Sequence, residues 1–185
     1  MDGASRLLGV RQQGRLNLDS SRRHALLSAS CGKGSYNTDT RRRDAAAYTA
    51  VDLAETDVEK AFLVNADGTE NLAEACAENN AQFIHVSTDY VFDGENNLAY
   101  TEEDFTNPLG VYGASKLAGD ELALEVNPCS VILRTSWVYS EFANNFMKTM
   151  LRLASERDSL SVVSDQIGTP TYAVDLANVL VTIIL

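Results

Sequence analysis

The chain has 185 residues, 45% of them hydrophobic, which is enough for one domain with a substantial core. No apolar run approaches the roughly 20 residues that a membrane-spanning helix needs, and the first residues do not resemble a secretory signal, so we expect a cytoplasmic protein with no membrane partner. Cys31, Cys76 and Cys129 are odd in number and widely spaced, which argues against a disulfide framework and against a zinc site.

The net charge of −11 is unevenly distributed along the chain. Residues 1–44 hold nine of the 15 Lys and Arg residues but only four of the 26 Asp and Glu residues, so residues 45–185 are strongly acidic. A basic arm can bind nucleic acid, but this one lacks interleaved aromatic residues and a recognisable nucleic-acid-binding motif, and we expect no such partner. Its composition, rich in Gly, Ser, Arg and Asn, predicts a poorly ordered segment.

From residue 45 onward, apolar residues recur at the spacings of helices and of short buried strands. Helices are predicted over residues 58–79, 112–126, 144–156 and 172–185, and strands over residues 83–86, 131–133 and 161–163. Helices that alternate with short apolar strands are typical of a parallel sheet covered on both faces. The sequence therefore predicts an α/β fold.

Tyr112 and Lys116 form a Y-x-x-x-K pattern at the start of a predicted helix. A spacing of four places both side chains on one helix face. An ammonium about 4 Å from the phenol interacts with the phenolate by on the order of 4 kcal/mol at an effective dielectric constant near 20, which would lower the tyrosine pKa from about 10 to roughly 7. Such a phenol is suited to general acid catalysis. An ordinary exposed helix face explains most patterns of this kind.

Two hydroxyl residues strengthen the catalytic interpretation. Ser87 and Thr88 directly follow the predicted strand 83–86, and ligands of open parallel sheets bind beyond the carboxyl ends of the strands. A hydroxyl placed there can orient a substrate carbonyl toward a phenol. The alternative is an ordinary strand-to-loop transition whose hydroxyls satisfy the backbone. The combination with Tyr112 and Lys116 favours the catalytic site.

These residues lie in longer runs that resemble the dTDP-4-dehydrorhamnose reductases, a family of extended short-chain dehydrogenases. The most particular runs are S-T-D-Y-V-F-D-G (87–94), N-P-L-G-V-Y-G-A-S-K-L-A-G (107–119), L-R-T-S-W-V-Y (133–139) and D-Q-I-G-T-P-T (165–171). Together with shorter runs, they cover about three quarters of the chain in one register. The Y-x-x-x-K pattern is shared by the wider superfamily, whereas S-T-D-Y-V-F and R-T-S-W-V-Y are far more particular to this family.

The resemblance implies a reductase that uses NADPH or NADH to reduce the 4-keto group of dTDP-4-dehydro-L-rhamnose to dTDP-L-rhamnose. It implies a dTDP-sugar as the small-molecule partner, assigns no residue to a metal, and leaves metal dependence and a homodimer open. The implied catalytic residues are Thr88, which would position the keto oxygen, Tyr112, the proton donor, and Lys116, which would tune Tyr112 and hold the nicotinamide ribose.

The resemblance also implies the residues that line the two ligands. The cofactor-binding residues would be Ala46, Ala47, Tyr48, Ser87, Tyr112, Lys116, Thr135 and Ser136. The substrate-binding residues would be Asp89, Tyr90, Trp137, Asn145 and Phe146. Trp137 has an equally plausible role in the core.

The N-terminal part departs from the family pattern, which opens with a strand and a T-G-x-x-G-x-x-G turn that cradles the cofactor pyrophosphate. Of the two glycine clusters, Gly3–Gly9 has Arg6 at the middle glycine and Gly32–Gly34 follows no predicted strand, so we reject both as phosphate loops. Residues 40–44 replace an apolar strand of the family, and three arginines are excluded from a strand buried on both faces. We therefore expect a partial Rossmann-like, doubly wound parallel sheet, lacking the first strands and the glycine-rich turn.

Two domains follow from this departure: an atypical basic segment over residues 1–44, and a partial NAD(P)-binding reductase domain over residues 45–185 that includes the start of the substrate-binding part. Two other functions stay open. One is a non-catalytic binding or regulatory protein on the same scaffold, as in the regulatory subunit of methionine adenosyltransferase. The other is an inactive gene fragment. The intact trio of Thr88, Tyr112 and Lys116 favours the reductase.

Overall fold

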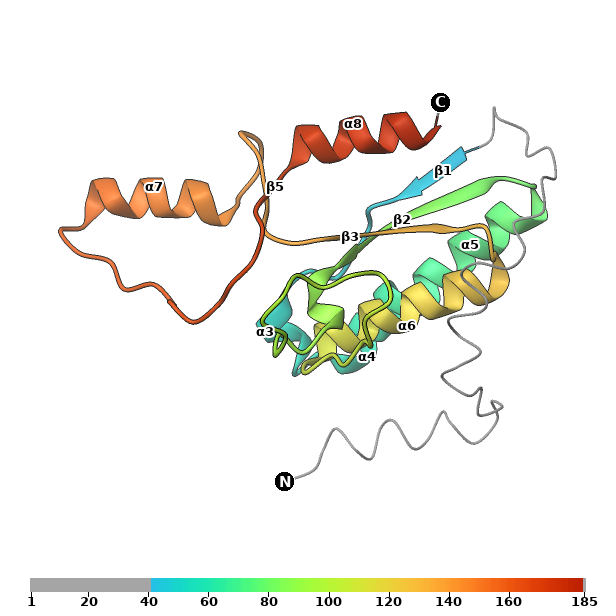
Figure 1. The fold of residues 1–185 in the computed structure, drawn as a ribbon, viewed down its shortest axis with the longest axis horizontal. Helices are drawn as coiled ribbons and strands as arrows, with labels where there is room; N and C mark the ends of the chain where they lie inside the picture. The colour runs from blue at the N-terminus through green and yellow to red at the C-terminus, as the bar shows by residue number, and fades with distance from the viewer. Residues whose placement is uncertain (1–40, 185) are drawn as a thin grey trace, which may run out of the picture. The chain divides into compact units, whose positions relative to one another are not determined.

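The computed structural model describes residues 41–184, whose helices and strands alternate (Figure 1). In chain order the elements are β1 (Arg41–Asp44), α3 (Val51–Ala54), α4 (Val58–Phe62), the π-helical segment η2 (Leu63–Asp67), α5 (Gly68–Glu78), β2 (Gln82–Thr88), the 3-10 helix η3 (Asp89–Val91), α6 (Val111–Val126), β3 (Val131–Thr135), β4 (Val138–Tyr139), α7 (Phe146–Glu156), β5 (Thr171–Tyr172) and α8 (Ala173–Ile184). The two glycine clusters rejected as phosphate loops lie outside the described residues.

A three-stranded parallel sheet forms the centre of the described structure, with the strand order β1-β2-β3. In the register of β2 with its neighbours, His85 pairs with Asp44 on one side and with Ile132 on the other. Because all three strands point the same way, their carboxyl ends meet at one edge of the sheet. The predicted α/β fold with a partial Rossmann-like parallel sheet is confirmed.

Strand β1 contradicts the exclusion of residues 40–44 from the sheet. Residues Arg41–Asp44 pair with Gln82–His85 of β2. The exclusion assumed a central strand buried on both faces, but within residues 41–184 β1 lies at the edge and pairs with β2 alone. Pairing at an edge uses backbone N–H and C=O groups, which arginine supplies as well as any other residue except proline.

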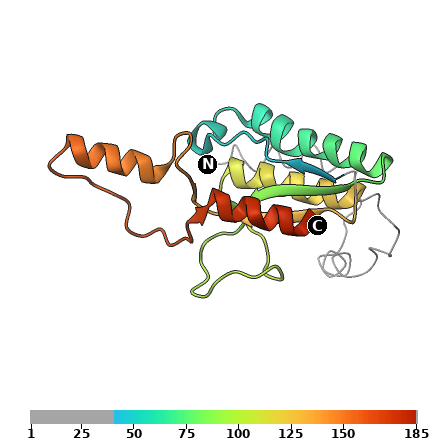
Figure 2. The same ribbon diagram turned by 90° about the horizontal axis from the view of Figure 1, so that it is seen from above.

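One face of β2 packs against helices α5 and α6, which lie side by side along the sheet (Figures 1 and 2). The apolar cluster between them consists of Phe83 with four small residues, Ala73, Cys76, Ala81 and Ala123. Small side chains on both helices let the backbones approach closely around one large ring. Phe83 is 1% exposed, so its ring supplies much of the apolar area buried at this contact.

The predicted helices are confirmed, with one refinement. Residues 58–79 form a nearly continuous helix, but its middle, Leu63–Asp67, has the π-helical form that is often found at functional sites. The helices α6, α7 and α8 begin within two residues of their predicted starts. Within residues 41–184, no helix combines the length and apolar character that crossing a membrane requires.

Of the predicted strands, those over residues 83–86 and 131–133 are confirmed, and each extends to the threonine at its carboxyl end. The prediction of a strand over residues 161–163 is wrong. Val162 and Val163 are exposed and carry no regular structure. A β-branched run becomes a strand only where a partner strand is available, and the second sheet instead pairs Val138–Tyr139 with Thr171–Tyr172.

Helix α6 approaches η2 closely at Gly119. A Cβ added to Gly119 would lie 2.1 Å from the backbone oxygen of Asn65, so only glycine fits at this position. Gly68, on the same helical stretch as Asn65, has φ −63°, and a Cβ added there would lie 3.5 Å from the backbone oxygen of Leu63, an ordinary van der Waals contact.

We predict that Gly119→Ala lowers the free energy of unfolding by about 1–3 kcal/mol or more, because α6 must move away from η2. Gly68→Ala is the matched control and should raise stability by about 0.5–1 kcal/mol, since alanine favours the helix. Urea unfolding of both variants provides the measurement. Equal effects of the two substitutions would contradict this packing.

Candidate active site at the carboxyl end of β2

The carboxyl end of β2 meets the first turn of α6, and this junction holds the predicted catalytic residues. Thr88 ends β2, and Tyr112 is the second residue of α6. The Thr88 hydroxyl hydrogen-bonds the Tyr112 phenol. The ring of Tyr90 packs edge-on against the ring of Tyr112, with 5.6 Å between their centroids. The structure thus brings together three of the predicted site residues, while their catalytic roles stay predictions.

Two contacts fix the start of α6 at this position. A Cβ on Gly113 would lie 2.2 Å from the backbone oxygen of Tyr90, so the glycine of the Y-G-A-S-K run lets α6 touch η3 directly. The Glu55 carboxylate accepts a hydrogen bond from the backbone N–H of Val111 at 2.8 Å. A carboxylate at a helix N-terminus satisfies a free N–H group and complements the helix dipole.

The pKa of Tyr112 moves in the opposite direction to the one expected from sequence. Burial of the phenol raises the pKa of Tyr112 above 10.0, and the negative charge of Asp89 adds to this effect. The hydrogen bond with Thr88 lowers the pKa of Tyr112 but does not outweigh the loss of solvent. The expectation of a lowered pKa is therefore wrong in this structure, because the desolvation of the phenol outweighs the interaction that lowers its pKa.

Lys116 lies one helical turn after Tyr112 and is almost completely buried, at 1% exposure. Its Nζ donates a hydrogen bond to the backbone oxygen of Val86 at 2.9 Å. The same Nζ is 2.7 Å from Nε2 of His85. The side chain of Lys116 is thus inserted between α6 and β2, where few lysines are found unless they have partners.

Directly beneath the site, between α6 and the sheet, lie five polar residues: His85, Ser87, Lys116, Asp120 and Arg134. We call them the polar layer. The Ser87 hydroxyl donates a hydrogen bond to Oδ2 of Asp120 at 2.8 Å, and Nε of Arg134 lies 3.7 Å from the same oxygen. Burial raises the pKa of Asp120, while Ser87, His85, Arg134 and Lys116 act in the opposite direction. Ser87, expected to contact the cofactor, is committed to Asp120 in this structure.

Sequence analysis missed His85 and Asp120. The spacing 112, 116, 120 continues one helix face and was the available signal for Asp120. No local signal marks His85, because its position on β2 opposite Lys116 depends on how the helix packs against the strand.

Asn65, also missed, holds the predicted cofactor loop in place. Its fully buried amide accepts a hydrogen bond from the backbone N–H of Tyr48 at 2.7 Å and donates one to the backbone oxygen of Tyr48 at 3.2 Å. It also donates to the Ser115 hydroxyl at 3.0 Å. One side chain therefore connects the loop of Ala46, Ala47 and Tyr48 to the helix that carries Tyr112.

The predicted residues after β3 lie at or near the same edge. Thr135 pairs with Thr88 in the sheet register, and its hydroxyl donates to the backbone oxygen of Ser87 at 3.2 Å. The Ser136 hydroxyl instead donates to the backbone oxygen of Thr169 at 2.6 Å, which ties this turn to the segment before β5.

Trp137 has φ 47°, a left-handed conformation that is strained for a large side chain and is common at functional sites. Its indole lies on the backbone of Gly168, where an added Cβ would be 2.9 Å from the ring. The indole is 46% exposed, so it presents a face to solvent instead of filling the core.

The other predicted substrate residues divide into two groups. Asp89 lies at the Tyr112 junction, where it accepts a hydrogen bond from the Thr88 hydroxyl at 3.1 Å and burial raises its pKa. Asn145 and Phe146 have local roles at the start of α7. Asn145 caps this helix by accepting from the backbone N–H of Lys148 at 3.1 Å, and Phe146 is exposed. Their approach to a nucleotide stays a prediction.

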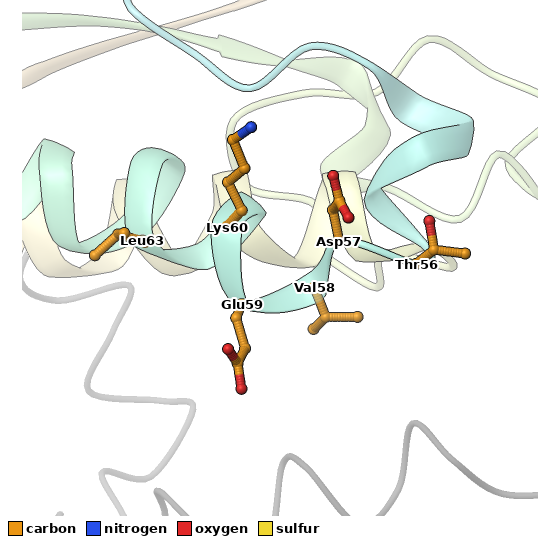
Figure 3. Close-up of a pocket in the computed structure, with 6 residues that line it drawn as sticks. All are labelled: Thr56, Asp57, Val58, Glu59, Lys60 and Leu63. Atoms are coloured by element: carbon orange, nitrogen blue, oxygen red, sulfur yellow. The ribbon is translucent and has the colours of Figure 1, made fainter.

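A surface hollow lies beside the predicted cofactor loop (Figure 3). It is lined by Thr56, Asp57, Val58, Glu59, Lys60 and Leu63. Asp57 accepts a hydrogen bond from the Tyr48 hydroxyl at 3.0 Å, and the Lys60 ammonium is 5.7 Å from the centre of the Tyr48 ring. Figure 3 shows Glu59 pointing away from Asp57 and Lys60, so the polar groups do not converge on one ligand. We assign no site to this hollow.

Comparison with known proteins gives a consistent picture. The family model described as the RmlD substrate binding domain matches residues 43–185. The dTDP-4-dehydrorhamnose reductase of Aggregatibacter actinomycetemcomitans is 56% identical over 140 residues, which are 76% of this chain and 48% of that protein. The enzyme of the same name from Escherichia coli K12 is 52% identical over 135 residues, 73% of this chain and 45% of that protein.

Solved structures agree. The crystal structure of a dTDP-4-dehydrorhamnose reductase from Clostridium acetobutylicum aligns with a TM-score of 0.75 and 46% identity, over 77% of this chain and 50% of that one. The enzyme from Bacillus anthracis, crystallised with NADP, aligns with a TM-score of 0.75 and 44% identity over the same shares. The chain thus spans about half the length of the relatives it matches.

We predict that Asn65→Ala lowers the free energy of unfolding by about 1–3 kcal/mol, because it leaves both backbone groups of Tyr48 without their buried partner. Amide hydrogen exchange of Tyr48 should accelerate more than exchange in β2. Asn96→Ala, in an exposed turn, is the control and should change neither. Unchanged exchange at Tyr48 in Asn65→Ala would refute the proposed link.

We also predict that Thr88→Val raises the pKa of Tyr112 further, since it removes the hydrogen bond that lowers this pKa. Thr88→Ser, which keeps a hydroxyl, should leave the pKa near its original value. An alkaline absorbance titration, corrected with the Tyr112→Phe counterpart of each protein, provides the measurement. A lower pKa in Thr88→Val would contradict the assignment.

The same pKa shift has a consequence for stability. Because folding raises the pKa of Tyr112, its contribution to stability is present below the unfolded value of about 10 and is lost as the pH rises through the folded value. Tyr112→Phe should therefore weaken the alkaline loss of stability, as measured by urea unfolding at increasing pH. An unchanged alkaline profile in this variant would contradict the raised pKa.

Proposed function

This chain belongs to the RmlD substrate-binding domain family, and we propose that it carries the catalytic residues of a reductase that converts dTDP-4-dehydro-L-rhamnose to dTDP-L-rhamnose. The observation that carries the proposal is the junction at the carboxyl end of β2, where the Tyr112 phenol is hydrogen-bonded to Thr88. The relatives named dTDP-4-dehydrorhamnose reductase support the substrate class. The chain spans about half their length, so the activity of the whole enzyme is part of what we propose.

We assign the cofactor as NADPH or NADH, on the model of the relative crystallised with NADP. The described residues fit its nicotinamide end, because the Tyr112 phenol and the Thr88 hydroxyl lie together at the carboxyl edge of the sheet and both can donate hydrogen bonds. When bound, the cofactor supplies a hydride to the 4-keto carbon. Both glycine clusters that the sequence analysis rejects as a pyrophosphate-binding turn lie among residues that the structure does not describe.

Tyr112 is the proton donor of this reaction. A raised pKa keeps the phenol protonated at neutral pH, which is the state a general acid needs before the reaction. The carbonyl oxygen becomes strongly basic as negative charge develops on it, and it then takes the phenolic proton. Thr88 orients that oxygen by a hydrogen bond, and Asp89 and Tyr90 face the sugar from η3.

Lys116 supplies positive charge near the phenolate that forms when Tyr112 gives up its proton. In the low dielectric between α6 and β2, that charge acts more strongly than it would in water. The positive charge therefore stabilises the phenolate that this step produces, and not the phenol that is present before the reaction.

A non-catalytic binding protein on the same scaffold is the competing candidate. It would bind a nucleotide sugar without turnover and would have no use for a phenol paired with a threonine hydroxyl. Binding and turnover therefore have to be measured separately.

We predict that Tyr112→Phe lowers the rate of NADPH oxidation with dTDP-4-dehydro-L-rhamnose by about 10²–10⁴-fold, the usual contribution of a positioned general acid. Binding of dTDP, measured by calorimetry, should stay within a few-fold of the original. Tyr100→Phe removes a phenol that bonds Asp93 in the loop after η3, and it is the matched control. Full activity in Tyr112→Phe would refute the proton-donor role, and dTDP binding without turnover by the unmodified chain would favour the binding protein.

A further inference from the structure

The polar layer beneath the site is buried to an extent that requires an explanation. Lys116 is 1% exposed, Asp120 is 2% exposed and His85 is fully buried. Phe83 stacks against the His85 ring from the apolar side, with 6.0 Å between ring centres and 19° between their planes. The imidazole is therefore held between an apolar core on one side and a lysine on the other.

The contact of 2.7 Å between Nζ of Lys116 and Nε2 of His85 constrains the protons of both groups. A lysine ammonium has three donors and no acceptor, so Nε2 must be the acceptor of this hydrogen bond. A protonated imidazole has no acceptor nitrogen and would place two cations in contact. His85 is then neutral, with its proton on Nδ1.

We propose that His85 is a positioning residue for Lys116: as a neutral imidazole protonated on Nδ1, it accepts a hydrogen bond from the ammonium and fixes it one turn beneath Tyr112, with Asp120 as the buried counter-charge. The kinetic consequence rests on the proposed function. The geometry and the assignment of the His85 proton do not depend on the proposed function.

A second hydrogen bond of the Lys116 ammonium shows what the contact with His85 contributes to its position. The backbone oxygen of Val86 accepts from Nζ at 2.9 Å, and it does so whatever the side chains nearby. This carbonyl holds the ammonium from one direction. His85 holds the ammonium from a second direction, through a fully buried ring that stacks on Phe83.

Asp120 completes the layer. Its Oδ2 accepts from Ser87 and faces Arg134, whose guanidinium lies 5.2 Å from the centre of the Phe92 ring. Its Oδ1 lacks a hydrogen-bond partner in the described structure and lies 3.7 Å from Nε2 of His85. A proton on Nε2 would be drawn to this oxygen, and His85 would then no longer accept from Lys116. Accepting from Lys116 therefore requires that Nε2 stay unprotonated.

The proposal is tested by nitrogen-15 NMR of the full chain labelled at histidine, at neutral pH. The chain has two histidines, and the signal that disappears in His85→Gln identifies His85. We expect the proton on Nδ1 and an unprotonated Nε2. In Lys116→Met the Nε2 signal should shift strongly, because its hydrogen bond is lost, whereas the surface variant Lys60→Met should leave it unchanged. A proton on Nε2, or an Nε2 signal that Lys116→Met does not move, would overturn the proposal.

A kinetic test distinguishes positioning from simple stabilisation. His85→Gln keeps an acceptor, whereas His85→Leu fills a similar volume without one. We expect His85→Leu to lower kcat about 10–100-fold with little change in the KM for the sugar nucleotide, the loss expected for one hydrogen bond to a charged group. His85→Gln should recover most of that loss. Equal kcat losses in both variants would mean that His85 only stabilises the fold, and would overturn the positioning role.

The two tests separate this inference from the proposed function. Should the unmodified chain show no turnover while the NMR result is as expected, the proposed function fails and the arrangement of His85 and Lys116 stands. Should turnover be present with the proton on Nε2, the proposed function stands and the positioning role of His85 fails.

Discussion

The direct contact of α6 with the carboxyl end of β2 is the constraint on which the rest of the structure depends. Two glycines make it possible, because Gly113 lies against the backbone of Tyr90 and Gly119 against the backbone of Asn65. The side chains of Tyr112, just before the first glycine, and of Lys116, between the two, lie on the helix face that packs against the strand. A separation larger by one methyl group would break the hydrogen bond between Tyr112 and Thr88, since hydrogen bonds weaken steeply with distance.

The interface between α6 and β2 changes in character along its length. At the amino end of β2 it is apolar, with Phe83 packed against Ala123, and toward the carboxyl end it becomes the polar layer around Lys116. Burying charged groups there costs stability unless they are paired and hydrogen-bonded. The apolar end offsets this cost, so the cation can be held beneath a phenol without exposure to water. The same desolvation raises the pKa of Tyr112 and keeps it protonated until a base appears.

Asn65 extends this arrangement to the loop before α3. Because its amide bonds both the Tyr48 backbone and Ser115, the loop cannot move without disturbing the helix that carries Tyr112. The π-helical form of residues Leu63–Asp67 widens the helix where Asn65 turns inward. A cofactor lying on this loop and a proton donor on α6 would thus share one rigid support.

From the sequence alone, β2, α6 and the approach of Thr88 to Tyr112 could be predicted. Apolar periodicity fixes a strand and a helix locally, and the carboxyl end of a parallel strand is where such groups meet. Only the tertiary structure decided that Arg41–Asp44 form an edge strand, that Val162 and Val163 lack a partner strand, and that His85 faces Lys116. These outcomes depend on neighbours distant in the chain. The direction of the Tyr112 pKa shift is also a result of the tertiary structure. Desolvation depends on what packs around the phenol and not on the spacing of the tyrosine from a lysine in the sequence.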